Sequence, residues 1–250
     1  MKIALCLSGG LRNFKDTYHT FSKFLLEKHD VDVFFYGLEN KEGKEKNIQD
    51  LIKLYNPKKF EVNDEQFYSN IICNYDIKSS FYGFYNVFKC NQLRNEYEVE
   101  ENIEYDLVIK SRTDCFWFRD LSEEELLNAK EKILTPVEWS FKIVNSFALS
   151  DVYAIGNSKM MNEYSNLFNR IDEYCQNIKF HPESLCGYHI MVNKIPYLEV
   201  NRSVIFEYPC ERTEKYIYPY KYAKLFTDIY ADIKDEGMYL EKSSHIRLSY

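Results

Sequence analysis

The N-terminal quarter of the chain alternates apolar runs with amphipathic segments, and this alternation limits the possible folds more than any other feature. Residues 2–7 and 31–37 are short apolar runs, and residues 58–64 alternate apolar with polar side chains, as strands do. Between them, residues 16–28 and 47–55 carry apolar side chains at helical spacing. This order predicts an α/β fold with a mostly parallel central sheet, flanked by helices and joined by right-handed crossovers.

The remainder of the chain continues this pattern. We expect a long helix over residues 79–102, with Ser79 or Ser80 as its N-cap, and then a central strand at residues 107–109. Further helices and strands are predicted at residues 122–132, 132–135, 150–174, 183–193 and 203–207. No repeat or linker interrupts the sequence, so one domain is expected over residues 1–250, with a less regular tail after residue 196.

Composition and charge narrow the classes of function. The formal net charge of −7 disfavours general binding to nucleic acid, which needs a basic surface. The 7 cysteines form no Cys-x-x-Cys pair, so neither a zinc ribbon nor a redox motif is predicted. No apolar run is long enough for a transmembrane segment, and the N-terminus lacks the pattern of a signal peptide. We therefore expect a cytoplasmic protein, with a peripheral position at a membrane left open.

The first apolar run stops abruptly at Ser8-Gly9-Gly10, and Arg12 follows two residues later. Glycines directly after a strand let the backbone approach a ligand and turn into the next helix, whose N-terminus favours anions. Arg12 would add a charge-assisted contact to a phosphate. The segment has neither the ending of a P-loop nor the full dinucleotide-binding fingerprint. A strand-to-helix turn with a surface arginine is therefore the alternative.

A second polar cluster, Lys110-Ser111-Arg112-Thr113-Asp114, follows the predicted central strand. In an open parallel sheet, ligands collect beyond the carboxyl ends of the strands, where these residues should lie. Lys110 and Arg112 could neutralise a diphosphate, and Asp114 could hold Mg²⁺ or Mn²⁺ against it. The alternative is a surface ion pair that contributes little to stability. The alternation of basic and acidic side chains directly after a buried strand favours the binding role.

Five segments occur along the chain in the order IALCLSGGLRNF, VDVFFYG, YDLVIKSRTD, SDVYAIGNSKMMNEYSNLF and HPESLCGYHI. Together they resemble a family of bacterial and viral glycosyltransferases related to lipopolysaccharide and capsule synthesis proteins of the WavE type. The resemblance covers residues 1–195. It implies a Rossmann-like GT-A fold, a nucleotide-diphosphosugar donor and, in most such enzymes, a divalent cation, Mn²⁺ or Mg²⁺.

The resemblance also assigns roles to individual positions. Ser8, Gly9 and Arg12 fall where such a fold seats the nucleotide, and residues 112–114 fall where GT-A enzymes carry an Asp-x-Asp metal motif. Arg112 replaces the first aspartate of that motif, which leaves Asp114 as its one carboxylate. A single carboxylate with diphosphate oxygens is a sparse ligand set for a divalent cation. Arg112 could instead take over part of the charge-balancing role of the metal.

Two acidic residues are candidates for the catalytic base. Asp151 opens the segment SDVYAIG, and Glu183 lies in HPES. An inverting sugar transfer needs one carboxylate to accept the proton of the attacking hydroxyl. Asp151 could instead be a cap or a structural ion-pair partner, and Glu183 could interact with the dipole of its helix. His189 could complete a metal site late in the chain, or it could be a hydrogen-bonded core histidine.

These observations favour a glycosyltransferase that moves a sugar from a nucleotide diphosphate to a hydroxyl of a glycan or lipid-linked glycan acceptor. One alternative is a nucleotidyltransferase that makes sugar nucleotides, although the loop from Ser8 to Arg12 is short for that chemistry. The other is a non-catalytic module that binds glycans or nucleotides, in which the acidic residues would have no chemical role. Turnover of a sugar nucleotide discriminates between these classes.

Overall fold

The computed structural model describes residues 1–11, 14–39, 44–117, 119–136, 148–200 and 206–207. In this part of the chain, seven strands form one sheet: β1 (Lys2–Gly10), β2 (Asp30–Leu38), β3 (Lys59–Asn63), β4 (Leu107–Arg112), β6 (Ile133–Pro136), β7 (Ala154–Gly156) and β8 (Tyr197–Val200). Two short strands, β5 (Phe116–Trp117) and β9 (Phe206–Glu207), pair separately.

The order of strands across the sheet is β3-β2-β1-β4-β7-β6-β8. β1 pairs in parallel with both β2 and β4, β2 pairs in parallel with β3, and β6 pairs in parallel with β8. β7 is antiparallel to its neighbours β4 and β6. The expected α/β fold with a mostly parallel sheet is therefore confirmed, and β7 makes the sheet a mixed one.

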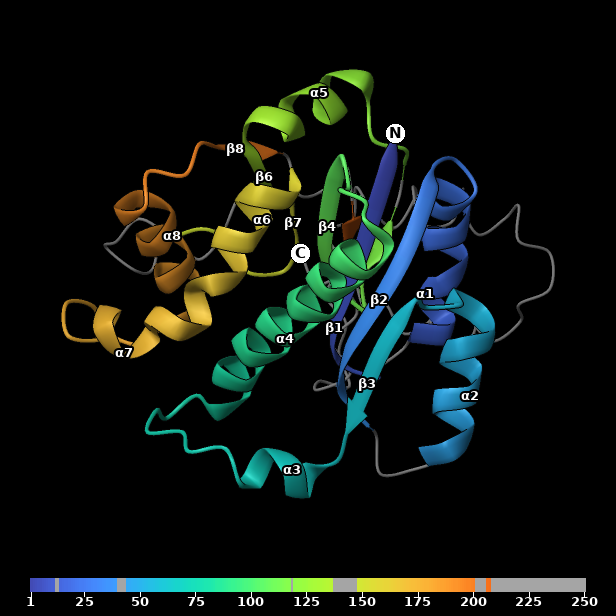
Figure 1. Cartoon of the computed structure of the whole chain (residues 1–250). Helices are drawn as coiled ribbons and strands as arrows, with labels where there is room; N and C mark the ends of the chain where they lie inside the picture. The colour runs from blue at the N-terminus through green and yellow to red at the C-terminus, as the bar shows by residue number, and fades with distance from the viewer. Residues whose placement is uncertain (12–13, 40–43, 118, 137–147, 201–205, 208–250) are drawn as a thin grey trace, which may run out of the picture.

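Helices cover both faces of this sheet (Figure 1). They are α1 (Phe14–Phe21), α2 (Lys44–Tyr55), α3 (Glu65–Ser69), α4 (Lys78–Glu101), α5 (Glu123–Glu131), α6 (Ser158–Ser165), α7 (Ile171–Tyr174) and α8 (Pro182–Val192), with a π-helical turn at Ser22–Leu26 and a 3-10 turn at Asn166–Arg170. α1 and α2 lie on one face, and α4 crosses the other (Figure 1).

β1 supplies both hydrophobic cores, because successive side chains of a strand point to opposite faces. Ile3, Leu5 and Leu7 pack into the core under α1 and α2, whereas Ala4 and Cys6 pack into the core under α4 and α6. All five side chains are buried. A strand buried on both faces reads as a continuous apolar run, which explains why the sequence identified β1 so clearly.

α4 begins earlier than the sequence suggested. Its N-cap residue is Ile77, which makes no side-chain capping bond, so Ser79 and Ser80 lie inside the first turn and the expected serine cap is wrong. The helix ends at Glu101, and its C-cap residue Asn102 has a left-handed backbone (φ 52°) that turns the chain out of the helix. By contrast, the predicted start of α5 is confirmed: Ser122 and Glu125 form a reciprocal capping box.

Further differences concern the strands and one short helix. β4 continues through Lys110 to Arg112, so these two basic residues belong to the strand and do not follow it. α3, β5 and β8 were not predicted. Of the predicted strand at residues 203–207, the structure describes only Phe206–Glu207, and most of the expected tail lies outside the described residues. Within the described part, no helix is long and apolar enough to cross a membrane.

Candidate functional site

The candidate site lies where the strand order reverses. From β1 the chain proceeds outward to β2 and β3 on one side, and it then returns to β4 on the other side. The carboxyl ends of parallel strands at such a switch point leave a crevice in which α/β proteins bind ligands. Ser8 on β1 and Arg112 on β4 are register partners at this edge. The two polar segments singled out in the sequence therefore end side by side.

A cavity of about 790 Å³ opens over these strand ends. Its lining includes most of the predicted site residues, namely Ser8, Gly9, Gly10, Lys110, Arg112, Asp114 and Asp151. Arg12, the remaining predicted phosphate ligand, lies outside the described residues. The structure thus brings together two loops that are far apart in the sequence, and it adds Asp151 from the segment before β7.

Thr113 joins the two loops directly. Its hydroxyl donates a hydrogen bond to the carbonyl oxygen of Gly10 at 2.6 Å. The carbonyl oxygen of Thr113 in turn accepts a hydrogen bond of 2.6 Å from the hydroxyl of Thr17 on α1. Since neutral hydrogen bonds of this length are well formed, the ends of β1 and β4 are held as one unit.

Two glycines allow the first loop to take its path. Gly9 has φ +110°, a backbone conformation that side chains disfavour. A Cβ atom on Gly37 of β2 would lie 1.7 Å from the carbonyl oxygen of Gly9, so only glycine fits there. The loop after β1 is thus shaped by a close approach between two strands.

Arg112 and Asp114 form a two-pronged ion pair at the cavity wall. Nε of Arg112 lies 2.8 Å from Oδ1 of Asp114, and Nη2 lies 2.7 Å from Oδ2. The Asp114 side chain is 4% exposed, whereas that of Arg112 is 30% exposed. Burial alone would lower the pKa of the guanidinium, but the adjacent carboxylate more than offsets it and raises that pKa. Arg112 is therefore a fixed cation with both oxygens of Asp114 as partners.

Lys110 is the buried cation of the site. Its ammonium group donates to the main-chain carbonyl of Asp151 and, at 3.2 Å, to that of Val152. Burial lowers the pKa of this amine, and the charge of Asp151 opposes that effect. An ammonium group has three donors, so two main-chain bonds leave one for a ligand in the cavity.

The charges around the cavity balance. Lys78, Lys110 and Arg112 line it together with Glu65, Asp114 and Asp151. Net charge therefore does not draw anions into the described part of the cavity, and binding of a diphosphate would depend on directed donors. Ser8 is one such donor, because this residue is 4% exposed and its hydroxyl makes no hydrogen bond within the described chain.

The two candidate bases differ in position. Asp151 lines the cavity beside Lys110. Glu183 lies in the first turn of α8, outside the cavity lining, with its carboxylate 3.4 Å from Nε2 of His181. The structure therefore places one of the two acids at the site and the other against a histidine.

His189 does not join the site. It is fully buried, and Nδ1 lies 2.9 Å from the hydroxyl of Tyr174 while Nε2 lies 2.8 Å from the carbonyl oxygen of Glu163. Both ring nitrogens are thus engaged in the core, which is the alternative that the sequence left open. Burial is the main reason that the pKa of this imidazole is lowered.

The described residues do not fit a divalent cation well. Both oxygens of Asp114 are held by Arg112. No three His, Cys, Asp or Glu side chains within the described ranges converge as metal ligands would. Magnesium and manganese prefer several oxygen ligands, and one carboxylate already paired with a guanidinium provides few.

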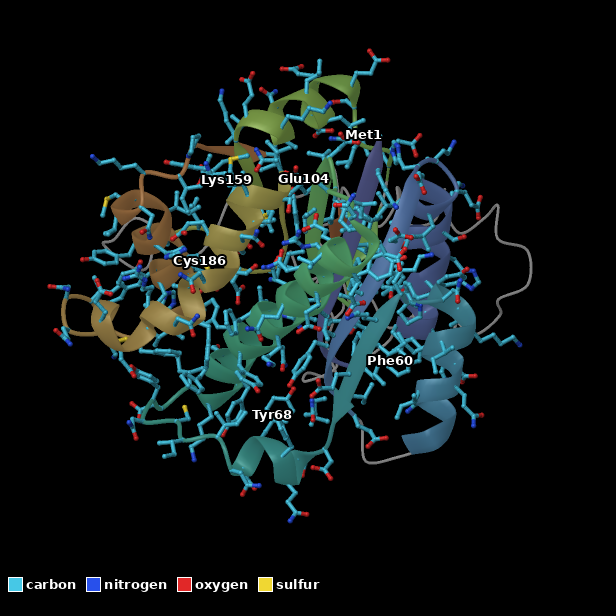
Figure 2. The ribbon with its side chains drawn as sticks, in the orientation of Figure 1. Met1, Phe60, Tyr68, Glu104, Lys159 and Cys186 are labelled. Carbon is cyan, nitrogen blue, oxygen red and sulfur yellow. The ribbon has the colours of Figure 1, made fainter. Side chains whose placement is uncertain are left out.

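Sequence reasoning missed the second half of the cavity. α3 and the first half of α4 form this wall, with lining residues that include Tyr68, Tyr82, Gly83 and Asn86. Figure 2 shows Tyr68 between α3 and α4. An isolated glycine inside a long helical pattern is the one signal that could have pointed to this wall, because such a glycine often has a packing or functional reason.

The fold and the site define an α/β protein with a polar cavity at the switch point of a mostly parallel sheet. The family described as Domain of unknown function (DUF7796) matches residues 1–200, and the chain belongs to this family. The match covers the whole sheet from β1 to β8 and every residue assigned to the site. No curated protein matches the chain.

Proposed function

We propose that this protein is a glycosyltransferase that uses a nucleotide-diphosphosugar donor, with a GT-A-like version of the α/β fold. One observation carries the proposal: the loop after β1, the end of β4 and the acidic residue Asp151 meet in one cavity at the switch point of the sheet. Glycosyl transfer needs these three elements together, namely a nucleotide cradle, cations for the leaving diphosphate and a base. The resemblance to WavE-type proteins supports the same class.

In this proposal the diphosphate lies between the ends of β1 and β4. Lys110 offers its third N–H donor, Ser8 offers its hydroxyl, and Arg112 supplies a fixed positive charge. As the bond from the anomeric carbon to the diphosphate oxygen breaks, its electron pair leaves with the diphosphate. Preorganised donors and cations stabilise this developing charge more effectively than water does, because they need no reorganisation.

Asp151 is the proposed base. The oxygen of the acceptor hydroxyl forms the new bond to the anomeric carbon, and its proton passes to the carboxylate of Asp151. The bond from Lys110 to the main-chain carbonyl of Asp151 fixes this residue relative to the proposed diphosphate site. We assign no chemical step to Glu183, since it lies outside the cavity lining.

The proposal is tested with the full chain and a panel of radiolabelled sugar nucleotides. Donor hydrolysis or transfer that is lost in Asp151→Asn and retained in Glu183→Gln supports it. If the wild type and both variants bind nucleotides but turn over no donor, the proposal of an enzyme is overturned in favour of a binding module. Formation of a sugar nucleotide from a sugar phosphate and a nucleoside triphosphate would instead identify a nucleotidyltransferase.

A further inference from the structure

The cavity has two chemically different halves. Lys110, Arg112, Asp114 and Asp151 gather over β1, β4 and the segment before β7. The opposite half is built by α3 and the first half of α4, where Tyr68, Tyr82, Gly83 and Asn86 form an uncharged stretch flanked by Glu65 and Lys78 at the starts of the two helices; we call these four residues the α4 wall. An uncharged, partly aromatic wall next to a charged one suits a ligand with one flat, neutral end.

Asn86 has a defined orientation in the α4 wall. The residue is 5% exposed, and its Oδ1 accepts a hydrogen bond from the hydroxyl of Tyr68. The Nδ2 group has no hydrogen-bond partner within the described chain, and Asn86 is one of the residues that line the cavity, so its N–H donors are available to a ligand there. Because the carbonyl end is occupied, Asn86 presents donors to a ligand, and the matching ligand atom is a hydrogen-bond acceptor.

Gly83 keeps the space beside this amide clear. It lies one helical turn before Asn86 and therefore on the same face of α4. A Cβ atom on Gly83 would meet nothing within 4 Å, so any side chain here would extend into open space at the cavity wall. Tyr82 adds an aromatic surface and packs edge-on against Tyr68, with ring centroids 5.4 Å apart.

We propose that the α4 wall holds the nucleobase of the donor and that the Nδ2 group of Asn86 pairs with the keto oxygen at C4 of a pyrimidine or at C6 of a purine. The site then takes uracil, thymine or guanine nucleotides in preference to cytosine or adenine nucleotides, whose corresponding position carries an amino group. This inference rests on the proposed function. In the proposed orientation the diphosphate lies at Lys110 and Arg112, the sugar lies toward Asp151, and the base extends to the α4 wall.

Keto and amino bases differ sharply at this contact. A keto oxygen accepts a hydrogen bond from the Asn86 amide, whereas an amino group would place one donor against another. A buried donor that loses its partner incurs the full cost of its desolvation. We therefore expect the keto nucleotide to bind about tenfold more tightly than its amino counterpart.

Calorimetric titration of the full chain with UDP, CDP, GDP and ADP tests this inference. We expect UDP to bind more tightly than CDP if the cavity takes pyrimidines, and GDP to bind more tightly than ADP if it takes purines. Equal affinity within each pair, or preference for CDP or ADP, would overturn the base assignment and leave the proposed function standing. Failure of all four nucleotides to bind would overturn the base assignment and the proposed function together.

Two variants sharpen the test. Asn86→Asp exchanges the donors for acceptors while an oxygen remains for Tyr68, so we expect the preference to reverse toward CDP or ADP. Gly83→Leu should weaken nucleotide binding by at least about tenfold without lowering the melting temperature, because leucine favours helices. Val99→Leu, on the exposed far part of the same helix, is the matched control. Nucleotide binding by Gly83→Leu at wild-type affinity would overturn the inference, even in the event that Asn86→Asp fails to fold.

Discussion

The hydroxyl of Thr113 donates a hydrogen bond of 2.6 Å to the carbonyl oxygen of Gly10, across 103 positions of the chain. This bond fixes the end of β4 against the loop that follows β1. The two strands already pair in parallel up to Ser8 and Arg112, so the hydroxyl extends their alignment beyond the last register pair. Any ligand that touches both loops therefore meets a preformed surface, which lowers the entropy lost on binding.

Thr113→Val tests this coupling, since valine keeps the shape of threonine and removes its hydroxyl. We expect the free energy of unfolding to fall by about 1–2 kcal/mol, because the Gly10 carbonyl loses a partner. Nucleotide affinity should fall as well, since the loops are no longer joined. Denaturant unfolding and calorimetric titration measure the two effects. Thr135→Val on β6, whose hydroxyl lies outside the cavity, should leave nucleotide affinity unchanged; equal losses of affinity in both variants would contradict the coupling.

We expect alanine substitutions at two glycines, Gly37 and Gly83, to change the free energy of unfolding in opposite directions. Gly37→Ala would force a Cβ atom to within 1.7 Å of the Gly9 carbonyl oxygen, so a backbone must move. We expect a loss of about 3 kcal/mol or more in the free energy of unfolding. Gly83→Ala fills open space on a helix and should stabilise the protein by about 0.5–1 kcal/mol. Urea titrations of both variants measure the signs, and destabilisation of equal size would show that the close approach of β1 to β2 is not what makes Gly37 necessary.

The sequence-based prediction succeeded where both faces of an element are buried. β1 and β2 read as continuous apolar runs because helices cover both sides of the sheet, so their position and the first half of the site could be predicted. It failed at α3 and β8. α3 has 5 residues, which is too short to show helical periodicity, and β8 lies at an edge where its side chains alternate between partly buried and exposed.

In the candidate site, too, residues next to a buried strand could be predicted and residues brought together by helix packing could not. Lys110 and Arg112 could be assigned to the end of a strand because they follow an apolar run, although the strand in fact includes them. Apart from the isolated Gly83, nothing in the sequence pointed to the α4 wall, since its residues come together only when α4 crosses the face of the sheet and α3 docks against it (Figure 1). Asn86 is a buried polar residue whose hydrogen-bond partner, Tyr68, lies on another helix, and the local sequence does not show such a partner.

The ion pair of Arg112 and Asp114 predicts how the protein responds to metal removal. With both Asp114 oxygens held by Arg112, the guanidinium supplies charge next to the proposed diphosphate. We expect treatment with EDTA to change the affinity for UDP or GDP, whichever binds, by less than about twofold, since the donors belong to the chain. Arg112→Lys retains the charge but cannot make the two-pronged contact, and it should weaken binding by about tenfold with or without Mn²⁺. Loss of binding in EDTA, restored by Mn²⁺, would show instead that a metal carries the charge.

If Asp151 is the base, its substitution should reduce sugar transfer without weakening nucleotide binding. Asp151→Asn removes the proton acceptor and retains the size of the side chain and the main-chain carbonyl that Lys110 contacts. We expect kcat for sugar transfer to fall by about 100- to 10,000-fold while the Kd of the nucleotide changes little. Glu183→Gln, outside the cavity lining, is the matched control and should retain kcat within a few-fold. The reverse pattern, with kcat lost in Glu183→Gln alone, would move the base to α8.

His189 predicts a pH dependence of stability that is independent of any activity. Burial lowers the pKa of this imidazole in the folded protein below its usual value of 6.5, so above pH 6.5 it is neutral in both states. As the pH falls below 6.5, the unfolded chain binds a proton there and the folded chain does not, so the free energy of unfolding decreases until the lowered pKa is reached. Unfolding in urea at several pH values from 7.5 to 5 measures this slope.

The matched variant is His189→Gln, which cannot titrate in this range. It should show a shallower decrease of the free energy of unfolding below pH 6.5 than the wild type, whatever its stability at pH 7.5. His29, whose pKa burial also lowers, is present in both proteins and therefore cancels in the difference. Parallel pH profiles would mean that His189 accepts its proton equally well in both states. The interpretation of His189 as a neutral core histidine with two hydrogen bonds would then be wrong. A charged His189 would have to be accommodated between Tyr174 and the carbonyl oxygen of Glu163.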